Sequence, residues 1–139
     1  MTRSIWILVL TSLVFGCSPD GDGGGDGGTP IPEVKLSELK DGFFQTSCSL
    51  SASCHKGPTG AAQLVLDGDV HAAIVNVEST QVPGQMLVIP GDVEGSYLWQ
   101  KVSGETPAVG TLMPPTNGLG DDPRLEDLKN WILNGAKDD

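Results

Sequence analysis

The stretch CSLSASCH, at residues 48–55, is the most informative part of this 139-residue sequence. It contains two thiols, Cys48 and Cys54, and His55 follows the second thiol directly. A c-type haem needs two thiols that add across its vinyl groups, and a histidine straight after the second thiol that reaches the iron from one face. The same two thiols can instead form a disulfide in an oxidising compartment. The cysteine pair alone does not decide between these interpretations.

The spacing of the two thiols departs from the usual haem motif, which leaves two residues between them. Here five residues intervene. On a regular helix, six steps would place the cysteines about 9 Å apart and on different faces. The intervening chain must therefore loop out. Ser51 occupies the position of the usual first cysteine, so a haem held by Cys54 alone is also compatible with the sequence.

A second candidate ligand is Met113, which lies in the long Gly- and Pro-rich loop at residues 104–120 and is followed by two prolines. A loop of this length in a small domain suggests a functional role. A thioether is a good sixth ligand for haem iron, although a lone methionine is as often a core residue. His71 is an alternative ligand that we expect at the surface, and we expect Met86 in the core.

Other kinds of site are less well supported by the sequence. Soft ligands suit Cu(I), so the set Cys48, Cys54, His55 and Met113 could bind copper, but it lacks the second histidine of a blue-copper site. The sequence contains neither a phosphate-binding loop nor a Gly-x-Ser-x-Gly hydrolase motif. The many Asp and Glu residues form no pair with a catalytic context, and we interpret them as a solvated acidic surface.

Apolar spacing predicts a mostly helical domain at residues 33–139. Residues 70–75 fit either a helix or a strand. The first and last helices are expected to cross, with Phe43 or Phe44 packed against Trp131 or Leu128. The predicted helices are residues 33–46, running into Cys48; residues 92–102; and a last helix from an N-cap at Asp122 and Pro123 to an αL cap at Gly135.

The N-terminal residues are expected to anchor the chain to a membrane. The apolar run Ile5–Phe15 is too short to span a bilayer but suits a secretory signal. Gly16-Cys17 follows it and resembles a bacterial lipoprotein signal, although Cys17 could also be incidental in an ordinary signal peptide. The resemblance implies removal of residues 1–16 and a lipid on Cys17. Residues 17–32, rich in Gly, Asp and Pro, are then a flexible linker.

The charge of the chain excludes some partners. Eight Lys and Arg face 18 Asp and Glu, which gives a net charge of -10. A nucleic-acid binder would show a basic face, and electrostatic docking on anionic lipid needs a polybasic segment. Neither is present in the sequence. Removal of residues 1–16 takes away one arginine, so seven basic and 18 acidic residues remain and the mature charge is -11.

In their order along the chain, these motifs resemble those of the cytochrome c-like domains of secreted and lipoprotein-anchored bacterial proteins. In that family the pattern is Cys, a few residues, Cys-His, then Pro-Gly-Asp, Ser-Tyr-Leu, Met-Pro and Trp-Ile-x-x-Gly-Ala. The matching residues here are Phe43-Phe44, Cys48, Cys54-His55, Val88 to Asp92, Ser96-Tyr97-Leu98, Lys101, Met113-Pro114-Pro115, and Trp131-Ile132 with Gly135-Ala136.

The resemblance implies a fold and a cofactor. It predicts a small all-α, cytochrome c-like domain with long loops around a haem cleft. It also implies haem c bound covalently through Cys48 and Cys54, with His55 as the proximal ligand. Met113 would be the distal ligand, and we expect these two ligands to face each other across one apolar cleft. With both axial positions filled, no catalysis is expected.

The expected function is electron transfer by an iron-binding lipoprotein in a bacterial cell envelope. The domain would face the periplasm or the cell surface, and Ser18 after the lipid-bearing cysteine favours the outer membrane by analogy. We expect a monomer whose redox partner carries a basic docking patch. The alternative is a haem-free binding or interaction domain on the same fold, stabilised by a Cys48–Cys54 disulfide.

Overall fold

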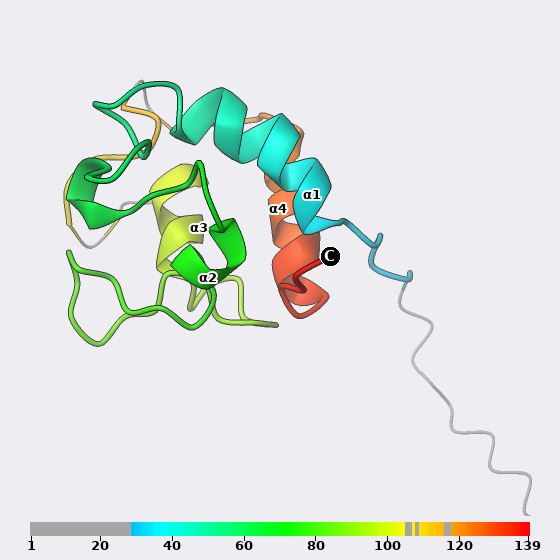
Figure 1. Cartoon of the computed structure of the whole chain (residues 1–139). Helices are drawn as coiled ribbons and strands as arrows, with labels where there is room; N and C mark the ends of the chain where they lie inside the picture. Colours follow the sequence, from blue (N-terminus) through cyan, green and yellow to red (C-terminus); the bar gives the residue numbers. More distant parts are fainter. Residues whose placement is uncertain (1–28, 105–106, 108, 116–117) are drawn as a thin grey trace, which may run out of the picture.

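The computed structural model of this protein describes residues 29–104, 107, 109–115 and 118–139 (Figure 1). The predicted signal sequence, the predicted lipidation site at Cys17 and residues 17–28 of the predicted linker lie outside the described residues. The chain forms short helices around a small core. In chain order these are α1 (Leu36–Leu39), the π-helix η1 (Lys40–Cys48), the 3₁₀ turn η2 (Ala61–Gln63), α2 (Val70–Ile74), α3 (Tyr97–Val102) and α4 (Arg124–Leu133).

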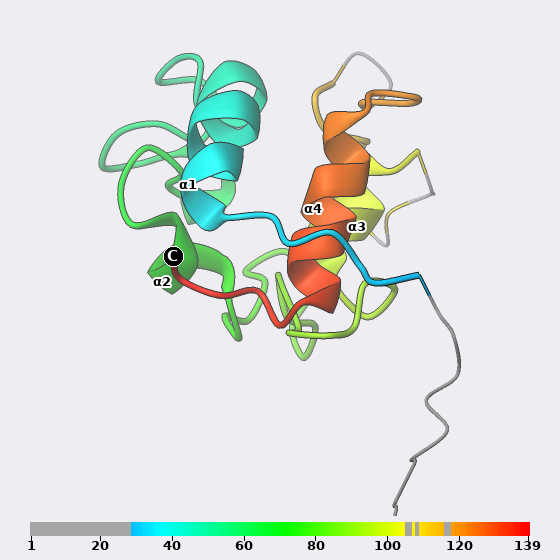
Figure 2. The same cartoon turned by 90° about the vertical axis from the view of Figure 1, so that its right-hand side faces the viewer.

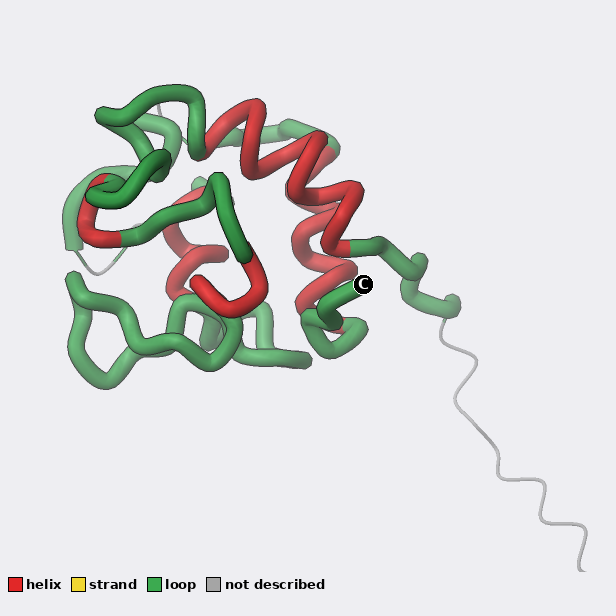
Figure 3. Tube along the Cα trace, viewed as in Figure 1, coloured by secondary structure: helices red, strands yellow, loops and turns green. Residues whose placement is uncertain are grey.

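The prediction of an all-α, cytochrome c-like fold class is wrong. Only 35% of the described residues are helical and 6% lie in β-bridges. Figure 3 shows short helical segments separated by long loops. Twelve of the 19 glycines of the chain lie in the described residues, and glycine and proline favour turns over helix interiors. Between α2 and α3, isolated bridges such as Val75 with Val88 and Glu78 with Met86 replace regular secondary structure.

The first helix, which consists of α1 and η1 together, begins at Leu36, later than the predicted residue 33, and runs to Cys48, two residues beyond the predicted end at residue 46. Its start is capped by the other end of the chain. The Asp139 side chain accepts from the Leu36 amide at 3.0 Å, and the Asp139 carbonyl accepts from the Ser37 amide at 3.2 Å. In both views the C-terminus lies close to α1 (Figures 1 and 2). This contact supplies partners for amides that have none within the helix.

The helix predicted at residues 92–102 is shorter than expected, because its first turn is not helical. The Asp92 carboxylate accepts from the Gly95 amide at 2.9 Å. The Ser96 hydroxyl donates to the Asp92 carbonyl at 2.6 Å and accepts from the Ile89 amide at 2.9 Å. These local bonds compete with a helix at the same residues. Helix α3 therefore begins only at Tyr97.

The last helix begins one residue later than predicted, because α4 starts at Arg124 with Pro123, and not Asp122, at the N-cap position; it ends at Leu133. The Asp122 carboxylate accepts from the Arg124 amide at 3.0 Å, and Gly135 adopts a left-handed φ of +94° just after the helix. Residues 70–74 are helical, and the Asp69 side chain caps them by accepting from the Ala72 amide at 3.0 Å.

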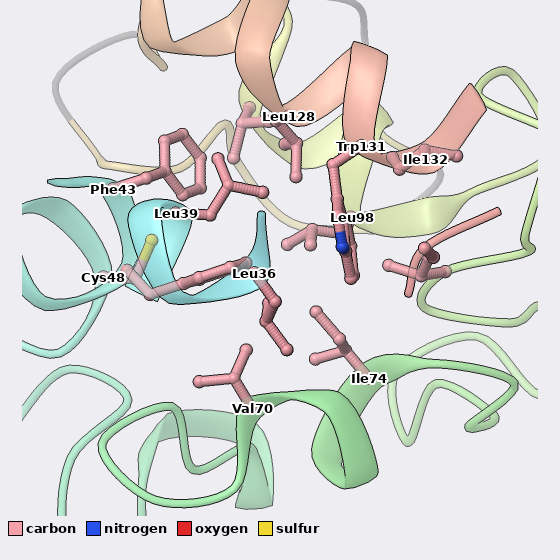
Figure 4. Packing of buried hydrophobic residues seen from close by; sticks show 14 of the residues in the cluster. Leu36, Leu39, Phe43, Cys48, Val70, Ile74, Leu98, Leu128, Trp131 and Ile132 are labelled. Atoms are coloured by element: carbon pink, nitrogen blue, oxygen red, sulfur yellow. The ribbon is translucent and has the colours of Figure 1, made fainter. Parts of the chain in front are cut away.

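The core lies where the first helix, α2, α3 and α4 meet (Figure 4). Leu39 and Phe43 point toward Leu128, and Trp131 lies beside Leu98. Phe43, Leu128 and Trp131 are each almost completely buried and belong to one cluster. The expected packing of the first helix against the last is therefore present, although the fold class that suggested it is not.

Candidate functional site

The structure brings together all four residues predicted to bind the haem. Cys48, Cys54, His55 and Met113 line one cavity of about 300 Å³. They come from the end of η1, the loop after it, and the loop that precedes α4. The cavity is within the size range of small-molecule sites, at its lower end. Most of its surface is apolar, and the apolar side chains in its wall include Leu64, Leu66, Ala73, Val77, Leu87, Leu98 and Val102.

His55 is held by its surroundings. Its backbone amide donates to the Cys48 carbonyl at 3.0 Å, and its own carbonyl accepts from the Leu66 amide at 2.8 Å. The ring Nδ1 lies 3.2 Å from the Leu64 carbonyl oxygen. A carbonyl can only accept, so Nδ1 donates, and Nε2 then carries the free lone pair of the neutral ring. This is the form of histidine that binds a metal through Nε2.

Gly60 makes room for the carbonyl that orients His55. A Cβ atom at residue 60 would lie 2.2 Å from the Leu64 carbonyl oxygen, which is too close for any side chain. Gly60 was not among the site residues predicted from the sequence. A glycine between the Cys-His motif and the apolar run that follows was the available signal, because glycine often marks a close backbone approach.

The two thiols are free in this structure but differ in their environment. Cys48 is buried, and burial raises its pKa to about 12. Cys54 is partly exposed, and its pKa is lowered mainly by a hydrogen bond to Ser51, whose hydroxyl oxygen lies 3.3 Å from its sulphur. Because the thiolate is the reactive form of cysteine, Cys54 is the more reactive thiol of the pair.

The Met113 side chain is half-buried and packs against the core. Its backbone amide donates to the Lys101 carbonyl at 2.6 Å. Tyr97 and Lys101 of α3 also line the cavity and hold the loop before Met113. From the sequence, Tyr97 and Lys101 were recognised only as parts of the motifs that resemble cytochrome c-like domains. Lys101 stands beside the apolar Val102 and one turn after Leu98, and this placement on a buried helix face could have identified it.

The other candidate ligands lie elsewhere. His71 is not among the residues that line the cavity. It was expected at the surface but is half-buried, and its Nε2 bonds to the Ala136 carbonyl at 3.0 Å. Met86 was expected in the core but is also only half-buried. Among the described residues, no three His, Cys, Asp or Glu side chains are arranged to hold a metal ion by themselves.

Comparisons with known proteins identified no relative of this chain. A scan against protein-family models, a search of curated proteins and a search of solved structures each returned no match. They connect the chain with no enzyme. Across residues 29–104, 107, 109–115 and 118–139, no helix has the length and apolar character needed to cross a membrane.

Proposed function

We propose that this chain binds a c-type haem in the cavity and carries electrons outside the cytoplasm. The observation that carries the proposal is the convergence of Cys48, Cys54, His55 and Met113 on one apolar cavity. Residue 113 is far from residues 48–55 in the sequence, so only folding brings these side chains together. The ordered motifs that resemble cytochrome c-like domains support the same function independently of the fold class.

The donor set fits this cofactor. His55 offers Nε2 because its Nδ1 is bonded to the Leu64 carbonyl, and Met113 offers a thioether at the same cavity. An imidazole and a thioether are an established axial pair for haem iron, which takes up and releases a single electron. Cys48 and Cys54 are free thiols at this cavity and would supply the covalent bonds to the haem.

The surroundings of the cavity favour electron transfer over catalysis. His55 and Met113 would be the residues that hold the iron, and the haem would then supply electron uptake and release. The cavity wall is mainly apolar, and exclusion of water from a redox centre is one of the factors that set its potential.

The proposed location follows from the sequence of the first 32 residues. A lipid on Cys17 and a Gly- and Asp-rich linker would keep the domain close to a bacterial envelope membrane. The net charge of -11 after removal of residues 1–16 favours a redox partner with a basic patch.

Expression of the full chain in a bacterium with haem-maturation genes tests the proposal. We expect a haem absorbance spectrum, haem staining that survives denaturing electrophoresis, and an intact mass that includes the cofactor. His55→Ala should abolish the low-spin spectrum, and Met113→Leu should change it while leaving the haem attached. His71→Ala, at the histidine outside the cavity, is the matched control and should behave like the wild type.

A wild-type chain without haem would contradict the proposal. If the mass of that chain were also two hydrogens below the value for free thiols, the chain would instead carry a disulfide. The alternative, a haem-free binding domain with a Cys48–Cys54 bond, would then be the better description.

A further inference from the structure

Lys101 is a buried cation beside the cavity, and the proposed electron transfer gives it no role. It is 7% exposed and lies on α3 next to the buried Val102 and one turn after the buried Leu98. Burial of an ammonium is costly unless its protons are bonded. Burial also lowers the pKa of Lys101 from its ordinary value.

The Lys101 ammonium is bonded to the loop that carries Met113. Its Nζ donates to the Thr111 carbonyl at 2.6 Å and to the Val109 carbonyl at 3.2 Å. Nζ also lies 5.8 Å from the centroid of the Tyr97 ring. Hydrogen bonds from a charged donor are stronger than those between neutral groups.

Tyr97 strengthens the same attachment. Tyr97 precedes Lys101 by one helical turn, so both side chains lie on one face of α3. Its hydroxyl donates to the Val109 carbonyl at 2.9 Å. The Met113 amide donates to the Lys101 carbonyl at 2.6 Å. Helix α3 therefore holds the loop at Val109, Thr111 and Met113.

Few apolar contacts could hold this loop otherwise. Val109 is 43% exposed, and Thr111 is exposed as well. Leu112 and Met113 are only half-buried. Met113 packs against the core, but a segment with so little apolar burial opens easily, so its attachment also depends on the polar bonds from α3.

We propose that Lys101 and Tyr97 are positioning residues that hold the loop at residues 109–113 against α3 and so keep the Met113 sulphur at the cavity. The consequence for iron ligation rests on the proposed function. The attachment of the loop to α3, however, is a property of the haem-free protein and can be measured without the cofactor.

Hydrogen exchange of the haem-free, full-length chain is the first test, with the Met113 amide as the reporter. Lys101→Met keeps the apolar stem and the backbone carbonyl that accepts from Met113, and removes only the ammonium. We expect Met113 exchange to accelerate about tenfold or more, because two charge-assisted bonds are lost. Tyr97→Phe removes one neutral bond and should give a smaller acceleration.

Three controls separate positioning from general loss of structure. Lys129→Met makes the same chemical change on the more exposed surface of α4 and should leave Met113 exchange unchanged. Lys101→Arg retains a charged donor and should restore part of the protection. Amides in α4 should keep their protection in every variant, which shows that the domain remains folded.

The haem-loaded protein provides the second test. The wild type should show the weak long-wavelength absorption of sulphur-to-iron charge transfer, and Lys101→Met should lose a measurable part of it. The reduction potential should fall in parallel, since a thioether ligand raises the potential. Lys129→Met should show neither change.

The outcomes are distinguishable. Unchanged Met113 exchange in both Lys101→Met and Tyr97→Phe would overturn the inference, whether or not the wild type binds haem. Met113 exchange could be faster in these variants than in the wild type although the wild type never takes up haem. This result would support the attachment of the loop and refute the proposed function. Full retention of the sulphur-to-iron band in loaded Lys101→Met would overturn the positioning of Met113.

Discussion

Cys48 and Cys54 line the same cavity, yet they differ in reactivity because they occupy different local structures. Cys48 is the last residue of the π-helix and is buried, which raises its pKa to about 12. Cys54 lies in the loop beyond, partly exposed and bonded to Ser51. At the residue scale, the wide spacing of the motif thus separates a reactive thiol from a protected one.

We predict that the two cysteines contribute unequally to haem attachment. Cys54→Ala should abolish covalent haem, because Cys54 adjoins His55 and ligation would hold its sulphur near one vinyl group. Cys48→Ala should leave some protein with one thioether bond. Ser51→Cys should raise the covalent yield, since residue 51 lies next to the Cys54 sulphur. Haem staining after denaturing electrophoresis, together with intact mass, measures all three. Equal and complete loss in both alanine variants would contradict the asymmetry.

We predict that Gly60→Ala damages the site through the Leu64 carbonyl. The added methyl would meet that oxygen at 2.2 Å, so the backbone must shift. The shift should cost about 1–3 kcal/mol of stability and weaken the bond that orients His55. Denaturant unfolding and the covalent haem yield report the two effects. Gly68→Ala is the control, because a Cβ at that loop glycine meets nothing within 4 Å.

At the scale of elements, Arg124 connects the start of α4 to η1. Its guanidinium pairs with the Asp122 carboxylate. It also donates to the Gly42 carbonyl at 2.9 Å and to the Thr46 hydroxyl at 2.8 Å. The Arg124 side chain therefore takes part both in the ion pair at the start of α4 and in the contact between α4 and η1.

Because Asp122 forms an ion pair with Arg124, we predict that the free energy of unfolding depends on pH. Hydrogen bonds from Arg124 lower the pKa of Asp122 from 3.8 to about 2. The ionised carboxylate is thus favoured in the folded state, and its stabilisation is present above pH 4 and lost as the pH falls through about 2. Asp122→Asn keeps a side-chain cap but removes the charge. Near neutral pH we expect it to lower the free energy of unfolding by about 1 kcal/mol, since the pair is partly exposed.

Urea unfolding at a series of pH values measures this effect. The difference between wild type and Asp122→Asn should shrink as the pH approaches 2. Asp127→Asn, at an exposed position on the same helix, is the control. A difference that stays constant from pH 7 to 2 would show that the ion pair is not its source.

A second prediction at this scale concerns the cap of α1. Asp139 supplies bonds to the first amides of α1 from the opposite end of the chain. Asp139→Ala should lower the free energy of unfolding by about 1 kcal/mol, as loss of an N-cap does. Denaturant unfolding measures it, and the exposed neighbour Asp138→Ala should have a smaller effect. Equal losses in the two variants would argue against a specific cap.

For the molecule as a whole, the net negative charge is the property that affects the approach of every charged partner. The net charge of -10 creates a negative field that extends about one Debye length into solution. This field acts on every charged partner, whatever its detailed surface.

We predict that added salt changes the rate of electron transfer with small charged reagents, and that the direction of the change depends on the charge of the reagent. The rate with the hexaammineruthenium cation should fall as ionic strength rises, because salt screens the attraction. The rate with ferricyanide should rise for the same reason. Stopped-flow absorbance of the haem-loaded protein measures both. Rates that ignore ionic strength would show that the net charge does not govern association.

Much of the candidate site could be predicted from the sequence, because the chemistry of a side chain follows from its residue type. Cys48, Cys54, His55 and Met113 were identified from thiol, imidazole and thioether chemistry and from the resemblance, and folding places them at one cavity. The ends of α4 were predictable to within about one residue, because Asp122 and Gly135 act on backbone groups within a few residues.

The extent of the helices and the support of the site depend on contacts that form only when the chain folds. Apolar periodicity at residues 92–102 favoured a helix, but the bonds of Asp92 and Ser96 form a turn that the periodicity does not register. The space needed at Gly60 and the loop attachment by Lys101 depend on carbonyl groups of other segments. The residue types along the chain therefore specify which groups can do chemistry, whereas long-range backbone contacts specify how these groups are held.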